Sequence, residues 1–320
     1  GLDTSTPGGR AGSDGRQTAR PQTIGCFMRH MWKYTLCTAA VGVVVSFGSV
    51  TRAQIQYASG QNVVPIYEGW YRNSDGTTDM LFGYLNRNWE QDLQIPVGAD
   101  NAIAGLPGGP DHGQPTIFFH RAEGKSMGRE QFVFRVRLPR DWGKTQELVW
   151  TLTAHGRTDK VIATLNPVEE VDDTVLAENR GGGIVAENKP PTVKVSASAQ
   201  TVTAVPGTVK LTAVYSDDGL PKRRPNRPTA AVSPIGTASR APRVPRVVWI
   251  YYRGPSAHGV KFDPGVSPIT EGTSATVETV ARFTEPGTYV LRALAEDPAL
   301  YSTADVTITV TGRTATQTGQ

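Results

Sequence analysis

Residues 131–138 have the sequence QFVFRVRL, and residues 147–154 have the sequence ELVWTLTA. Apolar side chains take every second position in both stretches: Phe132, Phe134, Val136 and Leu138 in the first, and Leu148, Trp150, Leu152 and Ala154 in the second. Such alternation is typical of β-strands that bury one face and expose the other. The two stretches therefore predict half-buried strands of an antiparallel sheet.

The rest of the chain extends this pattern. Short apolar or alternating stretches are separated by turn sequences rich in Gly, Asn, Asp and Pro, such as NSDGTT at 73–78 and GLPGGPDHGQP at 105–115. About seven short strands in roughly 110 residues favour an antiparallel sandwich. We therefore predict an all-β protein with two antiparallel β-sandwich domains, at 57–167 and 192–312, followed by a disordered tail at 313–320.

The segment between the two predicted domains has a different composition. Residues 168–191, VEEVDDTVLAENRGGGIVAENKPP, are acidic, contain three consecutive glycines and end in two prolines. This composition is typical of linkers. We expect the segment to connect the domains without belonging to either.

The N-terminal region indicates export. After Met28 come the basic residues Arg29 and Lys33, an apolar stretch at about 34–50, and small residues at positions 51 and 53. A secretory signal peptide needs these three parts. We predict a signal peptide at 28–53, an upstream or non-native extension at 1–27, and a secreted, periplasmic or cell-surface location. An uncleaved membrane anchor is the alternative, although the apolar stretch is near the lower limit for a span.

Cleavage would change the charge and cysteine content. Residues 1–53 hold six of the 33 Lys and Arg, two of the 29 Asp and Glu, and both cysteines, so 27 basic and 27 acidic residues remain afterwards. A neutral chain gives no reason to expect nucleic acid as a partner. A chain without cysteine forms no disulfide and has no thiol nucleophile.

The second predicted domain resembles a known family. Leu211, Trp249 and Leu291 lie on three separate predicted strands, and Tyr289 stands just after the Pro-Gly turn of EPGTYVL. The stretches LTAVYSDDGLP and YVLRALAEDPALYSTADVTITVTG are similar to strands of the bacterial Ig-like domains related to PKD and cadherin-like modules. The resemblance covers about 190–312 and implies an immunoglobulin-like sandwich. It departs from the family at 219–246, where the connection is much longer.

The first predicted domain resembles, in YEGWYRNSDGTTDMLFGYLNRNWEQDLQIPVG and GGPDHGQPTIFFHR, an uncharacterised module of exported bacterial proteins. That resemblance implies no activity. Its aromatic residues, among them Trp70, Tyr71 and Trp89, could form a platform on which sugar rings stack. The alternative is that alternating aromatic side chains fill the core of a sandwich.

Three carboxylates would meet at one pole of the second domain. Asp217 and Asp218 follow one predicted strand and Asp297 follows another. Calcium prefers several hard oxygen ligands of this kind, so calcium is a possible cofactor and we expect no other. The alternative is that the nearby basic loop neutralises them.

That loop, 219–246, is rich in proline and carries seven basic residues and no acidic one. Lys222, Arg223, Arg224 and Arg227 could contact an anionic polymer. The loop has no aromatic residues for stacking on bases, and an extended solvated loop is the alternative.

Patterns of catalytic residues are weak. The sequence GKSMG at 124–128 places Ser126 in a G-x-S-x-G pattern, but strands are predicted on both sides, which favours a hairpin loop. Asp111, His112, His120 and Glu123 lack the short spacing of catalytic metal sites.

We therefore predict no catalytic residues and an exported binding, adhesion or structural module, with a cell-surface polysaccharide or protein as partner. The alternatives are a subunit of an extracellular assembly, which self-associates through strand edges, and a secreted enzyme or accessory protein. The enzyme would have its site near the 98–115 loop and would need His112, Asp111 or Glu68 to converge in a cleft.

Overall fold

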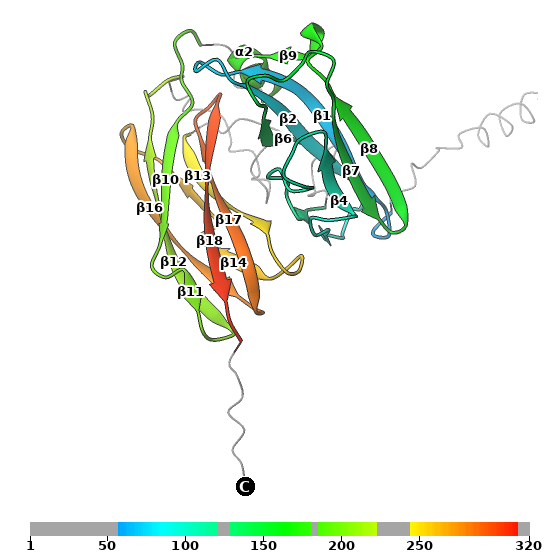
Figure 1. The fold of residues 1–320 in the computed structure, drawn as a ribbon. Helices are drawn as coiled ribbons and strands as arrows, with labels where there is room; N and C mark the ends of the chain where they lie inside the picture. The colour runs from blue at the N-terminus through cyan, green and yellow to red at the C-terminus, as the bar shows by residue number, and fades with distance from the viewer. Residues whose placement is uncertain (1–56, 121–128, 181–184, 223–243, 313–320) are drawn as a thin grey trace, which may run out of the picture. The chain divides into compact units, whose positions relative to one another are not determined.

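The computed structural model describes residues 57–120, 129–180, 185–222 and 244–312. The predicted extension at 1–27, the predicted signal peptide at 28–53 and the predicted tail at 313–320 lie outside these ranges. The described chain is built from β-strands, with one short α-helix and one 3₁₀ turn (Figure 1). The prediction of an all-β fold is confirmed.

The first sandwich has one four-stranded sheet and two smaller ones. The four-stranded sheet has the order β6-β2-β1-β9, formed by β1 (Val63–Arg72), β2 (Thr78–Asn86), β6 (Arg129–Arg137) and β9 (Glu170–Val171). A three-stranded sheet has the order β4-β7-β8, formed by β4 (Asn101–Ala104), β7 (Leu148–Ala154) and β8 (Arg157–Ala163). The strands β3 (Leu93–Gln94) and β5 (Ile117–Phe118) pair with each other.

Aromatic rings join the sheets of the first sandwich. Phe82 on β2 and Phe134 on β6 stack with their ring centroids 5.2 Å apart. The ring of Trp150 on β7 meets Phe134 edge-on at 4.9 Å. Offset and edge-on ring pairs add to the stabilisation from burial itself. The alternating residues that predict β6 and β7 thus form the contact between the two sheets.

The alternation breaks at one point of β6. Phe132, Val133 and Phe134 are all buried in succession, and Phe132 has a φ of 53°. The pairing register with β2 shifts there. Between the pairs Phe82–Phe134 and Tyr84–Glu130, residues 131–133 of β6 lie opposite the single residue Gly83. Such a bulge twists a strand and redirects its side chains. The backbone oxygen of Val133 accepts a hydrogen bond from Arg292 of the second sandwich at 2.9 Å, so the bulge lies at a contact between the sandwiches.

The second sandwich has two sheets. One has the order β10-β12-β16-β14, formed by β10 (Thr192–Ala197), β12 (Gly207–Ser216), β16 (Ser274–Phe283) and β14 (Val260–Asp263). The other has the order β11-β18-β17-β13-β15, formed by β11 (Thr201–Val202), β18 (Tyr301–Val310), β17 (Gly287–Glu296), β13 (Arg246–Arg253) and β15 (Val266–Pro268). Leu211, Trp249 and Leu291 are buried in one core between these sheets.

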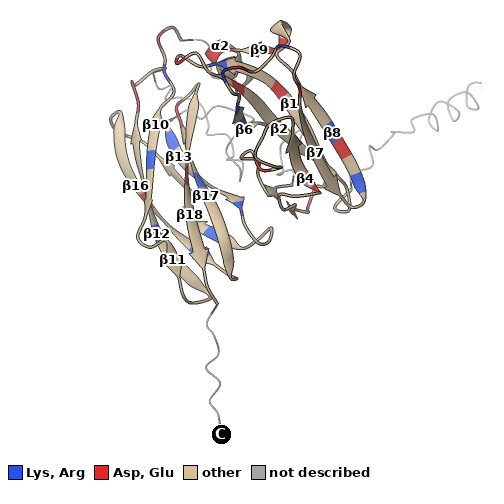
Figure 2. Ribbon diagram, viewed as in Figure 1, with Lys and Arg blue, Asp and Glu red and all other residues tan. Residues whose placement is uncertain are grey.

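Charged residues are spread over the strands of both sandwiches (Figure 2). On β8, an edge strand of its sheet, Arg157, Asp159 and Lys160 follow one another closely. Charges on an edge strand hinder its pairing with another chain.

The segment interpreted as a linker has regular structure. It contains η1 (Pro167–Glu169), β9, which pairs with β1, and α2 (Asp173–Asn179), whose first turn is capped by the Asp172 side chain. Leu176 and Ala177 of α2 are buried in the hydrophobic cluster that joins the first sandwich to part of the second. Much of this segment therefore packs as part of the first sandwich.

Strand β13 is buried on both faces. Every residue from 247 to 252 is buried. Val247, Trp249 and Tyr251 belong to the core of the second sandwich. The side chains between them, Val248, Ile250 and Tyr252, belong to the hydrophobic cluster that contains the core of the first sandwich. A strand buried on both sides has a continuous apolar sequence, VVWIYY, rather than an alternating one. The two sandwiches thus share apolar contacts along β13.

Candidate functional site: the junction of the two sandwiches

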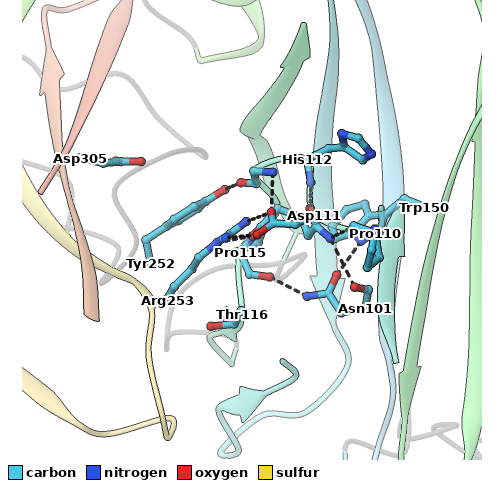
Figure 3. Close-up of polar contacts among 12 residues, drawn as sticks. Asn101, Pro110, Asp111, His112, Pro115, Thr116, Trp150, Tyr252, Arg253 and Asp305 are labelled. Atoms are coloured by element: carbon cyan, nitrogen blue, oxygen red, sulfur yellow. Dashed lines mark hydrogen bonds and ion pairs between the residues drawn. The ribbon is translucent and has the colours of Figure 1, made fainter. Parts of the chain in front are cut away.

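We use "the junction" for the contact between residues 110–116 of the first sandwich and Tyr252–Gly254 at the end of β13 (Figure 3). The 110–116 segment is placed by Asn101, which is fully buried on β4. The Asn101 side-chain amide donates to the Pro115 oxygen at 2.8 Å and to the Ile95 oxygen at 3.1 Å, and its oxygen accepts from the Trp150 indole at 3.0 Å. One buried amide therefore fixes the segment to the core.

Gln114 orders the same segment from within. Its amide nitrogen donates to the Pro110 oxygen at 2.7 Å, and its amide oxygen accepts from the His112 backbone N–H at 2.8 Å. Like Asn101, Gln114 is fully buried. Buried amides that make all these bonds hold a Gly- and Pro-rich loop in one conformation.

Arg253 binds this ordered loop from the other side. Its two terminal nitrogens donate to the two Asp111 oxygens at 2.8 and 2.9 Å, and its Nε donates to the Gln114 backbone oxygen at 2.8 Å. The Arg253 hydrogen bonds lower the pKa of the Asp111 carboxyl. Two-point pairing of this kind is stronger and more directional than a single charged contact.

Backbone groups extend the contact along β13. The Thr116 N–H donates to the Tyr252 oxygen at 3.2 Å, and the Gly254 N–H donates to the Thr116 hydroxyl oxygen at 3.2 Å. The Tyr252 hydroxyl donates to the Gly113 oxygen. Burial raises the pKa of Tyr252 to about 12, so the phenol stays protonated and remains a donor at neutral pH.

Arg292 supports the junction from β17. Its guanidinium lies 3.5 Å from the centroid of the Tyr252 ring and forms a two-point ion pair with Asp305 at 2.7 and 2.9 Å. It also makes the bond to Val133 described above. A stacked and fully paired guanidinium fixes the ring that it covers.

Deeper in the molecule, a buried charge network joins the end of α2 to the second sandwich. Arg180 follows α2, is 1% exposed and forms an ion pair with Glu296, which is fully buried. Arg246 also pairs with Glu296, at 2.6 Å. The Arg180 guanidinium lies 4.8 Å from the centroid of the Tyr301 ring, and the Tyr301 hydroxyl donates to the Phe132 oxygen at 2.8 Å.

The residues required for an enzyme have separate partners. Asp111 and His112 are adjacent in the junction, whereas Glu68 on β1 forms an ion pair with Arg129. Burial raises the pKa of Glu68. The contacts of these described residues therefore give no convergence of Glu68 with Asp111 and His112.

Of the residues considered as metal ligands or as a nucleophile, His120 has a partner of its own. The His120 ring nitrogen Nδ1 lies 2.6 Å from an oxygen of Asp92. Glu123 and Ser126 lie outside the described residues. Within the described ranges, no group of three His, Cys, Asp or Glu side chains is placed to hold a metal ion.

The predicted calcium residues lie at one pole of the second sandwich. Asp217 is half-buried, Asp218 is exposed and Asp297 is fully buried. Burial raises the pKa of Asp217, and the Asp218 charge adds to this effect. Burial also raises the pKa of Asp297 to about 6, with a smaller contribution from the Asp217 charge. The three carboxylates thus interact electrostatically.

A residue that sequence reasoning missed connects them. The Asn188 amide donates to Asp297 at 3.2 Å, and the next backbone N–H, of Lys189, donates to Asp218 at 2.9 Å. The side-chain oxygen of Asn188 and the Oδ1 of Asp217 are buried without a hydrogen-bond partner. The sequence signal was the Glu-Asn-Lys that precedes the two prolines, in the segment interpreted as a linker.

The aromatic residues proposed as a platform do not share an exposed surface. Trp70 is 5% exposed, and its indole N–H donates to the Asn166 oxygen at 2.8 Å. Tyr71 is next to it on β1, so its side chain points to the opposite face of the sheet, where its hydroxyl donates to Asp173 at 2.9 Å. Trp89 is half-buried after β2. A stacking platform needs exposed ring faces, which Trp70 does not offer.

Of the predicted polymer contacts, Lys222 is exposed. Arg223, Arg224 and Arg227 lie outside the described residues.

Comparisons with known proteins place the chain in no family. No protein-family model matches the sequence, and no curated protein matches it. Within the described ranges, no helix has both the length and the apolar character that crossing a membrane requires.

Proposed function

We propose that this protein is an exported, non-catalytic module for binding or scaffolding outside the cytoplasm, in which two sandwiches form one rigid unit. The observation that carries the proposal is the use of charged groups at the junction. Arg253 binds both a carboxylate, Asp111, and a backbone oxygen, Gln114, of the first sandwich. Arg292 pairs with Asp305 of its own sandwich and donates to the Val133 backbone oxygen of the first. Charge-assisted, two-point hydrogen bonds of this kind hold two surfaces together.

We also propose that the second sandwich is immunoglobulin-like. Its strand orders, β10-β12-β16-β14 and β11-β18-β17-β13-β15, support this assignment. So does the Tyr289 hydroxyl, which donates to the Glu285 oxygen four residues upstream at 2.8 Å. The kinship with PKD and cadherin-like modules rests on the sequence resemblance alone.

Export has a direct test. Residues 28–56 are fused to an alkaline phosphatase that lacks its own signal and that is active only outside the bacterial cytoplasm. The proposal predicts activity of the fusion in cells, and its loss when residues 35–50 are deleted. An inactive fusion, or one that the deletion leaves active, contradicts export through this segment.

A second candidate role is a calcium ion at the Asp217–Asp297 pole. The observation that favours it is the pair of buried oxygens without partners, on Asn188 and Asp217. Buried acceptors are normally satisfied, and calcium takes six to eight oxygens. Because the three carboxylates are not placed as a ready-made metal site, backbone oxygens and water would have to complete the set around Asp217 and Asn188.

Thermal unfolding with calcium chloride or with a chelator tests this role. Calcium should raise the melting temperature of the wild type and of Asp263→Asn, a control on an exposed position of β14. It should leave Asp217→Asn unchanged. Equal melting temperatures of the wild type with calcium and with chelator would remove the calcium role and leave the binding module intact.

A further inference from the structure

A groove of about 320 Å³ opens beside the junction. Both sandwiches line it: Gln94, Pro96 and Asp111 from the first, and Arg253, Pro255 and Thr288 from the second. Ligand sites prefer concave surfaces between packed units, and this volume is at the lower end of their range of roughly 300–1,000 Å³. The groove is therefore large enough for a short piece of a ligand.

The walls of the groove are held in place without a ligand. The Arg253–Asp111 ion pair joins two of them. The Gln94 amide donates to the Gly254 oxygen at 3.3 Å, and the Gly254 N–H donates to the Thr116 hydroxyl oxygen. A site that is already ordered loses less entropy when a ligand binds.

The charge of the lining selects against ions. Asp111 and Arg253 are the acidic and the basic residue of the lining, and they are paired with each other. An anion would meet the Asp111 carboxylate, whose side chain is 51% exposed. A cation would meet the guanidinium. A neutral ligand avoids both repulsions.

The same pair offers hydrogen bonds of both kinds. A guanidinium has five N–H donors, and three of those of Arg253 are used within the junction. Carboxylate oxygens accept more than one hydrogen bond, so Asp111 keeps acceptor capacity. Donor and acceptor groups side by side match neighbouring hydroxyls, each of which donates one bond and accepts another.

The remaining lining suits the same chemistry. Thr288 is exposed on β17 and adds a hydroxyl. Pro96 and Pro255 are exposed as well and present apolar ring surfaces. A sugar ring has hydroxyls at its rim and C–H groups on its faces, so both parts of the lining find a partner.

We propose that this groove binds a neutral polyhydroxylated glycan, with Asp111, Arg253 and Thr288 contacting its hydroxyls. The inference deepens the proposed binding function and rests on it. It names the class of polymer and the surface that takes it.

Titration calorimetry of the full chain tests the proposal with neutral oligosaccharides, namely cellohexaose, maltohexaose and xylohexaose, and with acidic oligogalacturonate. At least one neutral probe should bind, and oligogalacturonate should bind more weakly. Thr288→Val removes one hydroxyl and should weaken binding about three- to tenfold, the usual effect of one hydrogen bond. Gln94→Leu removes the hydrogen bond to the Gly254 oxygen that holds the groove wall, and it should weaken binding to a similar degree. Thr307→Val is the matched control, because Thr307 is exposed on β18 outside the groove lining, and it should bind as the wild type does.

Three results would overturn the proposal. They are no binding of any neutral probe, preferred binding of oligogalacturonate, and equal affinity of the wild type, Thr288→Val and Gln94→Leu. In the second and third cases the protein still binds a polymer, so the proposed function survives although the groove assignment does not. Melting temperatures of the variants equal to that of the wild type show that the changes act on binding and not on folding.

Discussion

Arg253 on β13 and Asp111 in the loop of the first sandwich, 142 residues apart in the chain, form a two-point ion pair at 2.8 and 2.9 Å. The Arg253 side chain is 20% exposed, whereas the Asp111 side chain is 51% exposed, so one partner of the pair is shielded and the other reaches solvent. Its third bond, to the Gln114 oxygen, adds a backbone anchor. The pair joins a loop of the first sandwich to the end of β13 in the second.

Removal of this pair should lower the free energy of unfolding. We expect Arg253→Ala to cost about 1–3 kcal/mol, since hydrogen bonds to charged groups contribute on this scale and the Gln114 oxygen loses its partner. Urea denaturation followed by circular dichroism measures the change. Arg282→Ala, at an exposed position of β16, should change stability by less than about 0.5 kcal/mol. Equal stabilities of the two variants would show that the ion pair contributes nothing.

The buried charge network should be sensitive to which charge is removed. Glu296→Gln leaves the buried Arg180 and the partly buried Arg246 without their carboxylate, and we expect it to cost about 3–5 kcal/mol. Arg180→Met should cost less, because Glu296 keeps Arg246 as its partner. The exposed pair of Lys210 and Glu278 gives the control Glu278→Gln, with a loss below about 1 kcal/mol. A lower denaturation midpoint for Arg180→Met than for Glu296→Gln would contradict the network as described.

The Tyr289 hydroxyl should stabilise the second sandwich. Tyr289 is fully buried, and its bond to the Glu285 oxygen anchors the start of β17. Tyr289→Phe should lower the free energy of unfolding by about 1 kcal/mol, the typical net effect of one hydrogen bond. Thermal melts compare it with Tyr57→Phe, since Tyr57 is 48% exposed. A melting temperature of Tyr289→Phe equal to that of the control would leave this hydrogen bond without an effect on stability.

The raised pKa of Asp297 predicts an unusual pH dependence of the free energy of unfolding. Its pKa is about 6 in the folded protein, against 3.8 as the ordinary value, because burial disfavours the charged form. The folded state therefore holds this proton more tightly than the unfolded state does. The stability that the protonated carboxyl provides is complete below about pH 4 and decreases as the pH rises to about 6, by at most about 3 kcal/mol.

Asp297→Asn checks the sign of this effect. The amide cannot ionise, so its stability should change less between pH 4 and pH 6 than that of the wild type. Urea midpoints measured across this range, without calcium, give the comparison. A wild type whose stability rises with pH as steeply as that of the variant would mean that Asp297 is not responsible.

The strands could be predicted where one face is buried and the other exposed. The strand predicted at 147–154 agrees with β7 to within one residue, because Leu148, Trp150 and Leu152 are buried and alternate with half-buried residues. Strand β13 was placed, but its second buried face was not foreseen, since a continuous apolar sequence does not say what covers each side. Helix α2 was missed because its few apolar residues lie in an acidic, glycine-containing segment that resembles a linker.

The junction could not be derived from the sequence. The polar residues of PDHGQPT indicate a turn, and nothing in them identifies Arg253 as a partner, because the contact depends on how two sandwiches pack. Asn101 and Gln114 are polar residues in a predicted loop region, where exposure is the usual expectation. Their complete burial follows from the backbone oxygens that they satisfy.

The central claim is that the two sandwiches form one rigid unit, and the unfolding of the full chain labelled with 5-fluorotryptophan tests it most directly. Trp150 is buried in the first sandwich and Trp249 in the second, so their separate fluorine NMR signals, assigned by single Trp→Phe changes, report on each one. We predict that both native signals disappear at the same urea concentration. Loss of the Trp249 signal at a clearly different concentration from that of Trp150 would show two independent domains and contradict the account.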